Sequence, residues 1–158
     1  MGGSDFYGGR SSEAEASGMS QAALDSGVSL LDTAGVCGPD ANGRLLGRAI
    51  AGRRNEVFLA SKFGLKLDPG NPQARGIDGR PEYVQAACED SLRRLGVDHI
   101  DLYYKNRVDL AVPIEDTVGA MARLVEQGKG RWRGLPEAQA ATVRRAHGGH
   151  PVRGGKSE

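Results

Sequence analysis

The feature that most constrains this chain is the repeated order of its apolar segments. Short runs rich in Val, Leu and Ile alternate along the chain with longer segments of helical periodicity. Strands are predicted at residues 28–32, 57–62, 100–104 and 131–135. Strands that alternate regularly with helices are typical of a parallel sheet built from right-handed crossovers. The predicted fold class is therefore α/β.

Helices are predicted between these strands, each with an apolar stripe or a helix-favouring composition. The expected helical segments are residues 12–26, 42–51, 81–95, 113–127 and 137–147. Glycines stand where the first four of these segments should end, at Gly27, Gly52, Gly96 and Gly128. Residues 63–80 are rich in Gly, Pro and Asp and are expected to form a long loop.

The length of the chain limits what this alternation can build. Its 158 residues suit one domain, predicted at 1–150 and followed by a polar tail at 151–158. A complete eight-stranded α/β barrel needs about 250 residues. A formal net charge of +1 and the lack of a long apolar run give no reason to expect a nucleic acid or a membrane as partner. No metal-ligand spacing is present either, and the expected location is the cytoplasm.

Polar side chains stand at the ends of the predicted strands, where α/β folds place their chemistry. Asp32 ends the first strand, Lys62 ends the second, and Asn106 follows the third. A Lys and an Asp on neighbouring strands would form an ion pair, which can shift the pKa of a nearby acid. Such a pair can equally be purely structural.

The strings around these residues resemble the aldo-keto reductase family over about residues 4–151. The matching stretches are LLDTAGVCGP, LLGRAIAGRR, VFLASKFG, IDGRPEYVQAACEDSLRRLGVDHIDLYYKNRVD and VPIEDTVGAMARLVEQGK. The resemblance implies a (β/α)8 barrel that reduces aldehydes and ketones with NADPH. It also implies that this chain is a partial barrel, with roughly strands 2–5 and their helices, and without the first strand and the C-terminal part.

In that family an aspartate, a tyrosine, a lysine and a histidine act together, and the aspartate also helps to bind the cofactor. Asp32 and Lys62 match two of these positions. Cys37 stands at the position of the tyrosine, and Asn106 stands at that of the histidine. Pro136 replaces a serine that holds the nicotinamide in the family.

The two replaced positions differ in their chemical consequence. The tyrosine is the general acid, and loss of such an acid typically lowers a rate by about 10²–10⁴-fold. The side chain of Cys37 is shorter by a whole ring, so its thiol cannot reach the position of the phenol oxygen. An amide N–H of Asn106 can still donate to a carbonyl oxygen.

We therefore expect an aldo-keto reductase-like chain whose catalysis is lost or strongly weakened and whose binding of NADPH is impaired. Its substrate by resemblance would be a small carbonyl compound. One alternative is a non-catalytic fragment or binding module that associates with an intact relative, another partner or itself through open barrel edges. Another is a thiol sensor at Cys37, because a nearby Lys62 would lower the pKa of that thiol.

Overall fold

A five-stranded parallel sheet forms the centre of the molecule. The computed structural model describes residues 13–35, 41–68, 71–135, 140–150 and 154–155. The sheet has the order β1-β2-β5-β6-β7, and every neighbouring pair is parallel. Its strands are β1 (Leu30–Ala34), β2 (Phe58–Phe63), β5 (Ile100–Lys105), β6 (Gly130–Leu135) and β7 (Gly154–Gly155). The predicted α/β class and parallel sheet are confirmed.

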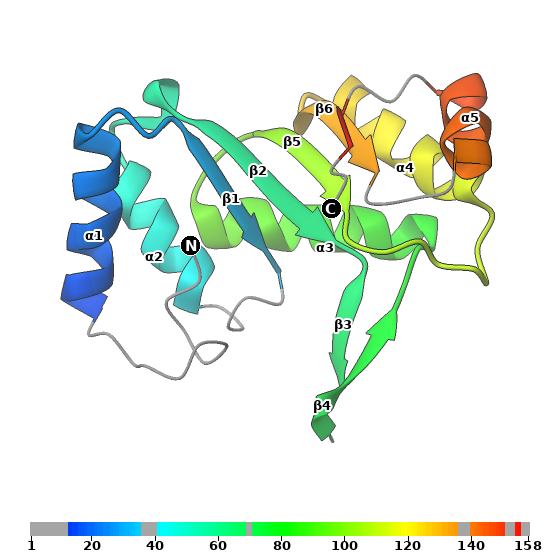
Figure 1. The fold of residues 1–158 in the computed structure, drawn as a ribbon, viewed down its shortest axis with the longest axis horizontal. Coiled ribbons are helices and arrows are strands. Elements are labelled where there is room, and N and C mark those ends of the chain that lie inside the picture. Colours follow the sequence, from blue (N-terminus) through cyan, green and yellow to red (C-terminus); the bar gives the residue numbers. More distant parts are fainter. Residues whose placement is uncertain (1–12, 36–40, 69–70, 136–139, 151–153, 156–158) are drawn as a thin grey trace.

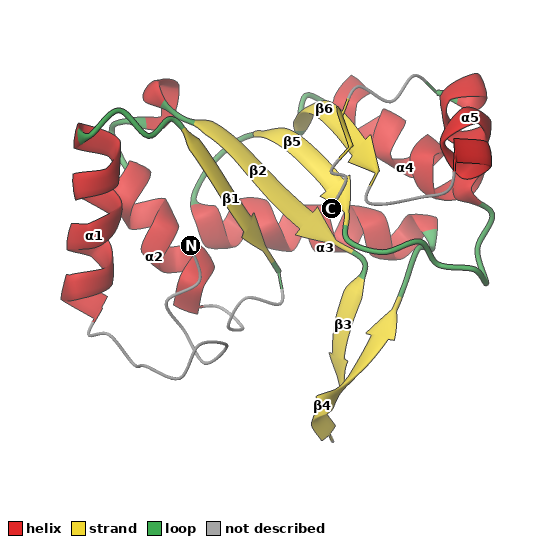
Figure 2. Ribbon diagram, viewed as in Figure 1, coloured by secondary structure: helices red, strands yellow, loops and turns green. Residues whose placement is uncertain are grey.

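The helices lie along one face of this sheet. They are α1 (Glu13–Asp25), α2 (Ala41–Ile50), α3 (Pro81–Leu95), α4 (Ile114–Glu126) and α5 (Ala140–Gly149), with a short 3-10 helix, η1, at Arg54–Glu56. Figure 2 shows α2, α3 and α4 behind the strands, whereas no described helix lies in front of them. The main apolar core fills the space between the strands and helices α2, α3 and α4, with Leu59, Val84, Tyr103 and Met121 all at most 2% exposed.

Glycines end the helices and permit one close helix crossing. Gly27, Gly52, Gly96 and Gly128 all have positive φ, as the predicted helix ends require. Gly47 of α2 has a different role, because a Cβ atom there would lie 2.4 Å from the carbonyl oxygen of Leu95. The backbones of α2 and α3 can approach this closely only because residue 47 has no side chain.

The first strand begins two residues later than its apolar pattern predicts. The amide of Val28 donates to the carbonyl of Ala23, so Val28 belongs to the C-terminal turn of α1. Pairing with β2 starts where Leu30 faces Phe58. Asp32 therefore lies in the middle of β1 and is not its last residue, which corrects the predicted position.

The segment predicted as a loop contains an antiparallel hairpin. Strands β3 (Leu65–Asp68) and β4 (Asn71–Ile77) pair with each other and project from the sheet (Figure 1). Their base is held by the amide of Asp78, which donates to the carbonyl of Gly64, and by the hydroxyl of Tyr83, which donates to the carbonyl of Leu65. The expectation of a loop was wrong. The hairpin is formed by backbone pairing, and its strands show no apolar alternation that the sequence could reveal.

Two smaller differences concern the C-terminal part. Helix α5 starts at Ala140, three residues after its predicted start, and residues 136–139 lie outside the described part. The two residues of β7 pair with Gly134 and Leu135 within the segment that the sequence indicated as a polar tail. In the described ranges, no helix is long and apolar enough to cross a membrane.

Candidate functional site

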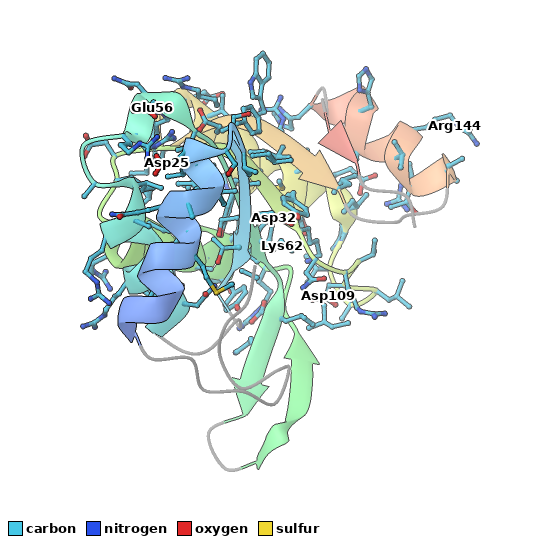
Figure 3. The ribbon with its side chains drawn as sticks, turned by 60° about the vertical axis from the view of Figure 1, so that its left-hand side comes forward. Asp25, Asp32, Glu56, Lys62, Asp109 and Arg144 are labelled. Atoms are coloured by element: carbon cyan, nitrogen blue, oxygen red, sulfur yellow. The ribbon has the colours of Figure 1, made fainter. Side chains whose placement is uncertain are left out.

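Asp32 and Lys62 form an ion pair on the face of the sheet that carries no described helix. Lys62 faces Ala34 in the parallel register, so Asp32, two residues earlier on β1, points to the same face. Nζ of Lys62 lies 2.5 Å from Oδ2 of Asp32. Figure 3 shows the two side chains next to each other. The side chains are 35% exposed for Asp32 and 21% exposed for Lys62, so this is a partly buried, solvent-reachable pair.

A third side chain, that of Tyr104, completes this cluster. Its hydroxyl donates toward the Asp32 carboxylate, at 2.8 Å from Oδ1 and 2.9 Å from Oδ2. Nζ of Lys62 lies 5.0 Å from the centre of the Tyr104 ring, within the range of a cation–π contact. Tyr104 is 7% exposed, so it is the most buried of the three residues.

The sequence prediction did not include Tyr104, although a signal for it was present. Tyr104 stands two residues before Asn106, and alternate residues of a strand point to the same face. In the register of the sheet it also faces Lys62 directly. Strand periodicity therefore places it beside the predicted site residues.

Asn106 follows β5 and borders a cavity at the same edge of the sheet. Its backbone amide donates to the carbonyl of Phe63 at 2.7 Å, which fixes its position beside the end of β2. The cavity has a volume of about 290 Å³ and lies between the ends of β1 and β2, the start of β3, and α3. Lys62 and Asn106 both line it. Asp32 and Tyr104 are not among its described lining residues.

The structure thus brings Asp32 and Lys62 together and places Asn106 at the same cavity as Lys62. Cys37 and Pro136 lie outside the described residues, so the predictions at those positions stay predictions. Among the described ranges, no group of His, Cys, Asp or Glu side chains is placed to hold a metal ion.

The described residues do not form a site for a dinucleotide. The cavity of about 290 Å³ lies at the lower limit of ordinary small-ligand pockets, which span roughly 300–1,000 Å³. Asp32, the one residue predicted to contact the cofactor, already accepts from Lys62 and Tyr104 through its two oxygens. The cavity that these residues line is therefore small for a whole dinucleotide.

The described sheet has helices on one face and a Lys–carboxylate pair with an adjoining cavity toward the carboxyl ends of its strands, which is the arrangement of part of an α/β barrel. The comparison with known families makes this specific. Residues 1–153 match the model of the aldo/keto reductase family, and the chain belongs to that family.

Solved structures of the family support the same conclusion. An aldo-keto reductase from Bacillus halodurans in its holo form has a TM-score of 0.81 and 29% identity, over 89% of this chain and 47% of that one. A glycerol dehydrogenase from Gluconobacter oxydans has a TM-score of 0.82 and 30% identity, over 92% of this chain and 45% of that one. An aldo/keto reductase from Klebsiella pneumoniae, solved with NADP and acetate, has a TM-score of 0.74 and 27% identity, over 95% of this chain and 50% of that one.

The chain therefore spans about half the length of the solved relatives that it matches. The predicted family and the partial (β/α) barrel are confirmed. Relatives of this chain are known as complexes with NADP or NADPH, which makes NADPH the cofactor that the family implies.

Proposed function

We propose that this chain is an aldo-keto reductase-like protein that binds small carbonyl compounds but reduces them at a strongly diminished rate or not at all. Lys62 and Asn106 at the cavity provide hydrogen-bond donors for a carbonyl oxygen. Reduction also requires a proton that reaches this oxygen as hydride arrives. The family's tyrosine provides that proton, and Cys37 stands at its position in this chain.

The observation that supports this proposal most is the orientation of Tyr104. Among the described residues, Tyr104 provides the phenol that contacts the Asp32–Lys62 pair. Its hydroxyl, however, donates to the Asp32 carboxylate. The residue is buried and does not line the cavity. A general acid must come within hydrogen-bond reach of the atom that it protonates, and Tyr104 does not meet this condition.

The experiment that tests this proposal measures cofactor binding and turnover separately. Binding of NADPH is followed by fluorescence titration of the purified chain, and carbonyl reduction by the loss of NADPH absorbance with a reactive aromatic aldehyde. We expect weak or no binding of NADPH and no aldehyde-dependent oxidation above that of a Lys62→Met variant. Tight binding with turnover that depends on Lys62 would contradict the proposal.

A second candidate function is that of a binding module, which the face of the sheet without a described helix would allow. Leu30, Phe58 and Trp132 are 58%, 39% and 43% exposed, and strand alternation places Leu30 and Phe58 on the same face as Asp32 and Lys62. Exposed apolar strands favour association with another chain. Light scattering on the eluting protein tests this, since an assembly larger than a monomer supports it and a stable monomer contradicts it.

The thiol-sensor alternative and the cytoplasmic location stay predictions from the sequence. Alkylation of Cys37 as a function of pH tests the sensor, because an ordinary thiol has a pKa of about 8.5. A value near that figure would remove the alternative.

A further inference from the structure

We propose that protonation of Lys105 opens the base of the β3–β4 hairpin, so that the position of this hairpin depends on pH. The inference does not rest on carbonyl binding, although the hairpin contributes Leu65 and Lys66 to the wall of the cavity. The observation that carries it is a buried amine without a partner of opposite charge. Lys105 is the last residue of β5 and is 0% exposed, and it forms no ion pair with any of the described residues.

The amine of Lys105 lies against the hairpin base, by which we mean Asp78 and Gly79. Its Nζ donates to the backbone carbonyl of Asp78 at 3.5 Å, which is a long hydrogen bond. A Cβ atom on Gly79 would lie 2.4 Å from this Nζ, so the amine occupies the space that a side chain at residue 79 would need. Nζ also lies 5.5 Å from the centre of the Phe63 ring. A charged amine here would therefore exchange its water shell for one long hydrogen bond and one aromatic contact.

The charged groups that face Lys105 are the carboxylates of Asp78 and Asp109, and both already bind other donors. The Asp78 carboxylate accepts from the guanidinium of Arg80 at 2.8 Å and 3.1 Å. The Asp109 carboxylate accepts from two backbone amides, that of Gly79 at 2.8 Å and that of residue 111 at 2.9 Å. Neither carboxylate forms an ion pair with Lys105, and so neither compensates fully for the burial of a charge on its amine.

Short hydrogen bonds hold the hairpin base in place around this amine. The hydroxyl of Thr117, at the start of α4, donates to the carbonyl of Gly79 at 2.6 Å. The amide of Asp78 donates to the carbonyl of Gly64, just after β2, at 2.8 Å. Thr117 and Phe63, which approach Lys105 from α4 and β2, are uncharged. The base is therefore closed over a group that it can accommodate more easily as a neutral amine than as a cation.

The direction of the pH dependence follows from this geometry. Burial lowers the pKa of the Lys105 amine, and the carboxylates of Asp109 and Asp78 oppose that shift only in part. If the base opens, the amine reaches water and regains the ordinary lysine pKa of about 10.4. Opening is then coupled to the uptake of a proton at any pH between these two pKa values. Within that interval the opening constant should fall by up to about tenfold for each unit of rising pH.

Thermal unfolding of Lys105→Met and the parent chain, followed by circular dichroism from about pH 6 to about pH 10, tests the burial of the amine. Methionine fills a similar volume and does not titrate. We expect Lys105→Met to melt at a higher temperature than the parent at the lower pH, and this difference to shrink as the pH rises. Lys129→Met is the control, because Lys129 is partly exposed and paired with Glu89, and its loss should not raise the melting temperature.

Hydrogen exchange of the Asp78 amide reports the opening of the hairpin base itself, because this amide is bonded to the carbonyl of Gly64. Comparison of two chains at the same pH cancels the intrinsic pH dependence of exchange. We expect faster exchange in the parent than in Lys105→Met near about pH 6, and a ratio that approaches one as the pH rises. Thr117→Val removes the hydrogen bond to Gly79, and it should speed exchange by a factor that does not vary with pH.

Both measurements must agree for the inference to stand. A melting difference between Lys105→Met and the parent that stays constant or grows with pH would refute it, because the amine would then be charged and well paired in the folded chain. The expected melting difference with equal exchange of the Asp78 amide in the two chains would refute the opening of the hairpin base. The expected result in both supports the inference. Neither measurement uses a carbonyl ligand, so a failure here leaves the proposed function in place.

Discussion

Replacement of Gly47 by alanine should loosen the contact between α2 and α3. A Cβ at residue 47 would lie 2.4 Å from the oxygen, 2.8 Å from the carbon and 3.1 Å from the Cα of Leu95. All three are backbone atoms, so no side-chain rotation can relieve the overlap. Comfortable contacts between carbon atoms lie near 3.5–4.0 Å, and the helices would therefore have to separate by about 1 Å.

The expected cost follows from two opposing effects. Overpacking of a tight interface typically costs about 1–3 kcal/mol, and the absence of a flexible neighbour places Gly47 in the upper half of that range. Alanine in place of glycine within a helix recovers about 1 kcal/mol. We expect Gly47→Ala to lower the free energy of unfolding by roughly 1–2 kcal/mol.

Gly18 of α1 provides a matched control, because nothing lies within 4 Å of the Cβ that it would carry. Gly18→Ala should raise the free energy of unfolding by roughly 0.5–1 kcal/mol, since only the helix propensity changes. Urea unfolding followed by circular dichroism measures both variants. A Gly47→Ala protein as stable as Gly18→Ala would refute the close approach of the two helices.

Three further predictions concern the ionisable and catalytic positions. Cys37→Tyr alone should not restore carbonyl reduction, and measurable NADPH-dependent turnover by that variant would show that the cofactor-binding part is less deficient than we propose. Hydrogen bonds from Arg80 lower the pKa of Asp78 to about 2, so the stabilisation by the Asp78 carboxylate is complete above about pH 4 and is lost as the pH falls through about 2. The difference in the free energy of unfolding between the parent chain and Asp78→Asn should shrink over that interval. A constant difference would contradict the assignment. Burial raises the pKa of Cys88 to about 12, so native protein should leave Cys88 unmodified by a thiol reagent at pH about 8, with modification only after denaturation, as mapped by mass spectrometry.

The order of strands and helices could be predicted because the apolar periodicity and the helix-ending glycines agree with each other. Gly27, Gly52, Gly96 and Gly128 mark the helix ends in the sequence and have positive φ in the structure. The exact start of β1 could not be predicted, because the hydrogen bond of Val28 to the preceding helix competes with strand pairing. Local composition does not reveal which of the two contacts prevails.

The hairpin of β3 and β4 could not be predicted for a related reason. Its strands contain Pro72, Gly76 and several polar residues, which are all typical of loops. Its base is stabilised by tertiary contacts, such as the hydrogen bond from Tyr83 to Leu65, that no local pattern shows.

Within the site, Asp32 and Lys62 could be predicted because each ends an apolar run of the sequence and lies within a family string. Strand periodicity could have indicated Tyr104 as a residue on the same face as Asn106, but its place directly opposite Lys62 depends on the register between β2 and β5. The cavity could not be predicted, because it depends on the placement of α3 beside the strand ends. Two of its lining residues, Arg94 and Lys66, are far apart in the sequence. Such groupings depend on tertiary structure.

We propose that none of the described side chains delivers a proton to a bound carbonyl while hydride arrives. The most direct measurement incubates the purified chain with an aldehyde and NADPH that carries deuterium at the transferred position, and mass spectrometry then quantifies deuterium in the alcohol product. We predict no deuterated alcohol above the level of a Lys62→Met control. Deuterated alcohol that accumulates in proportion to the intact chain, and not to the control, would contradict the account.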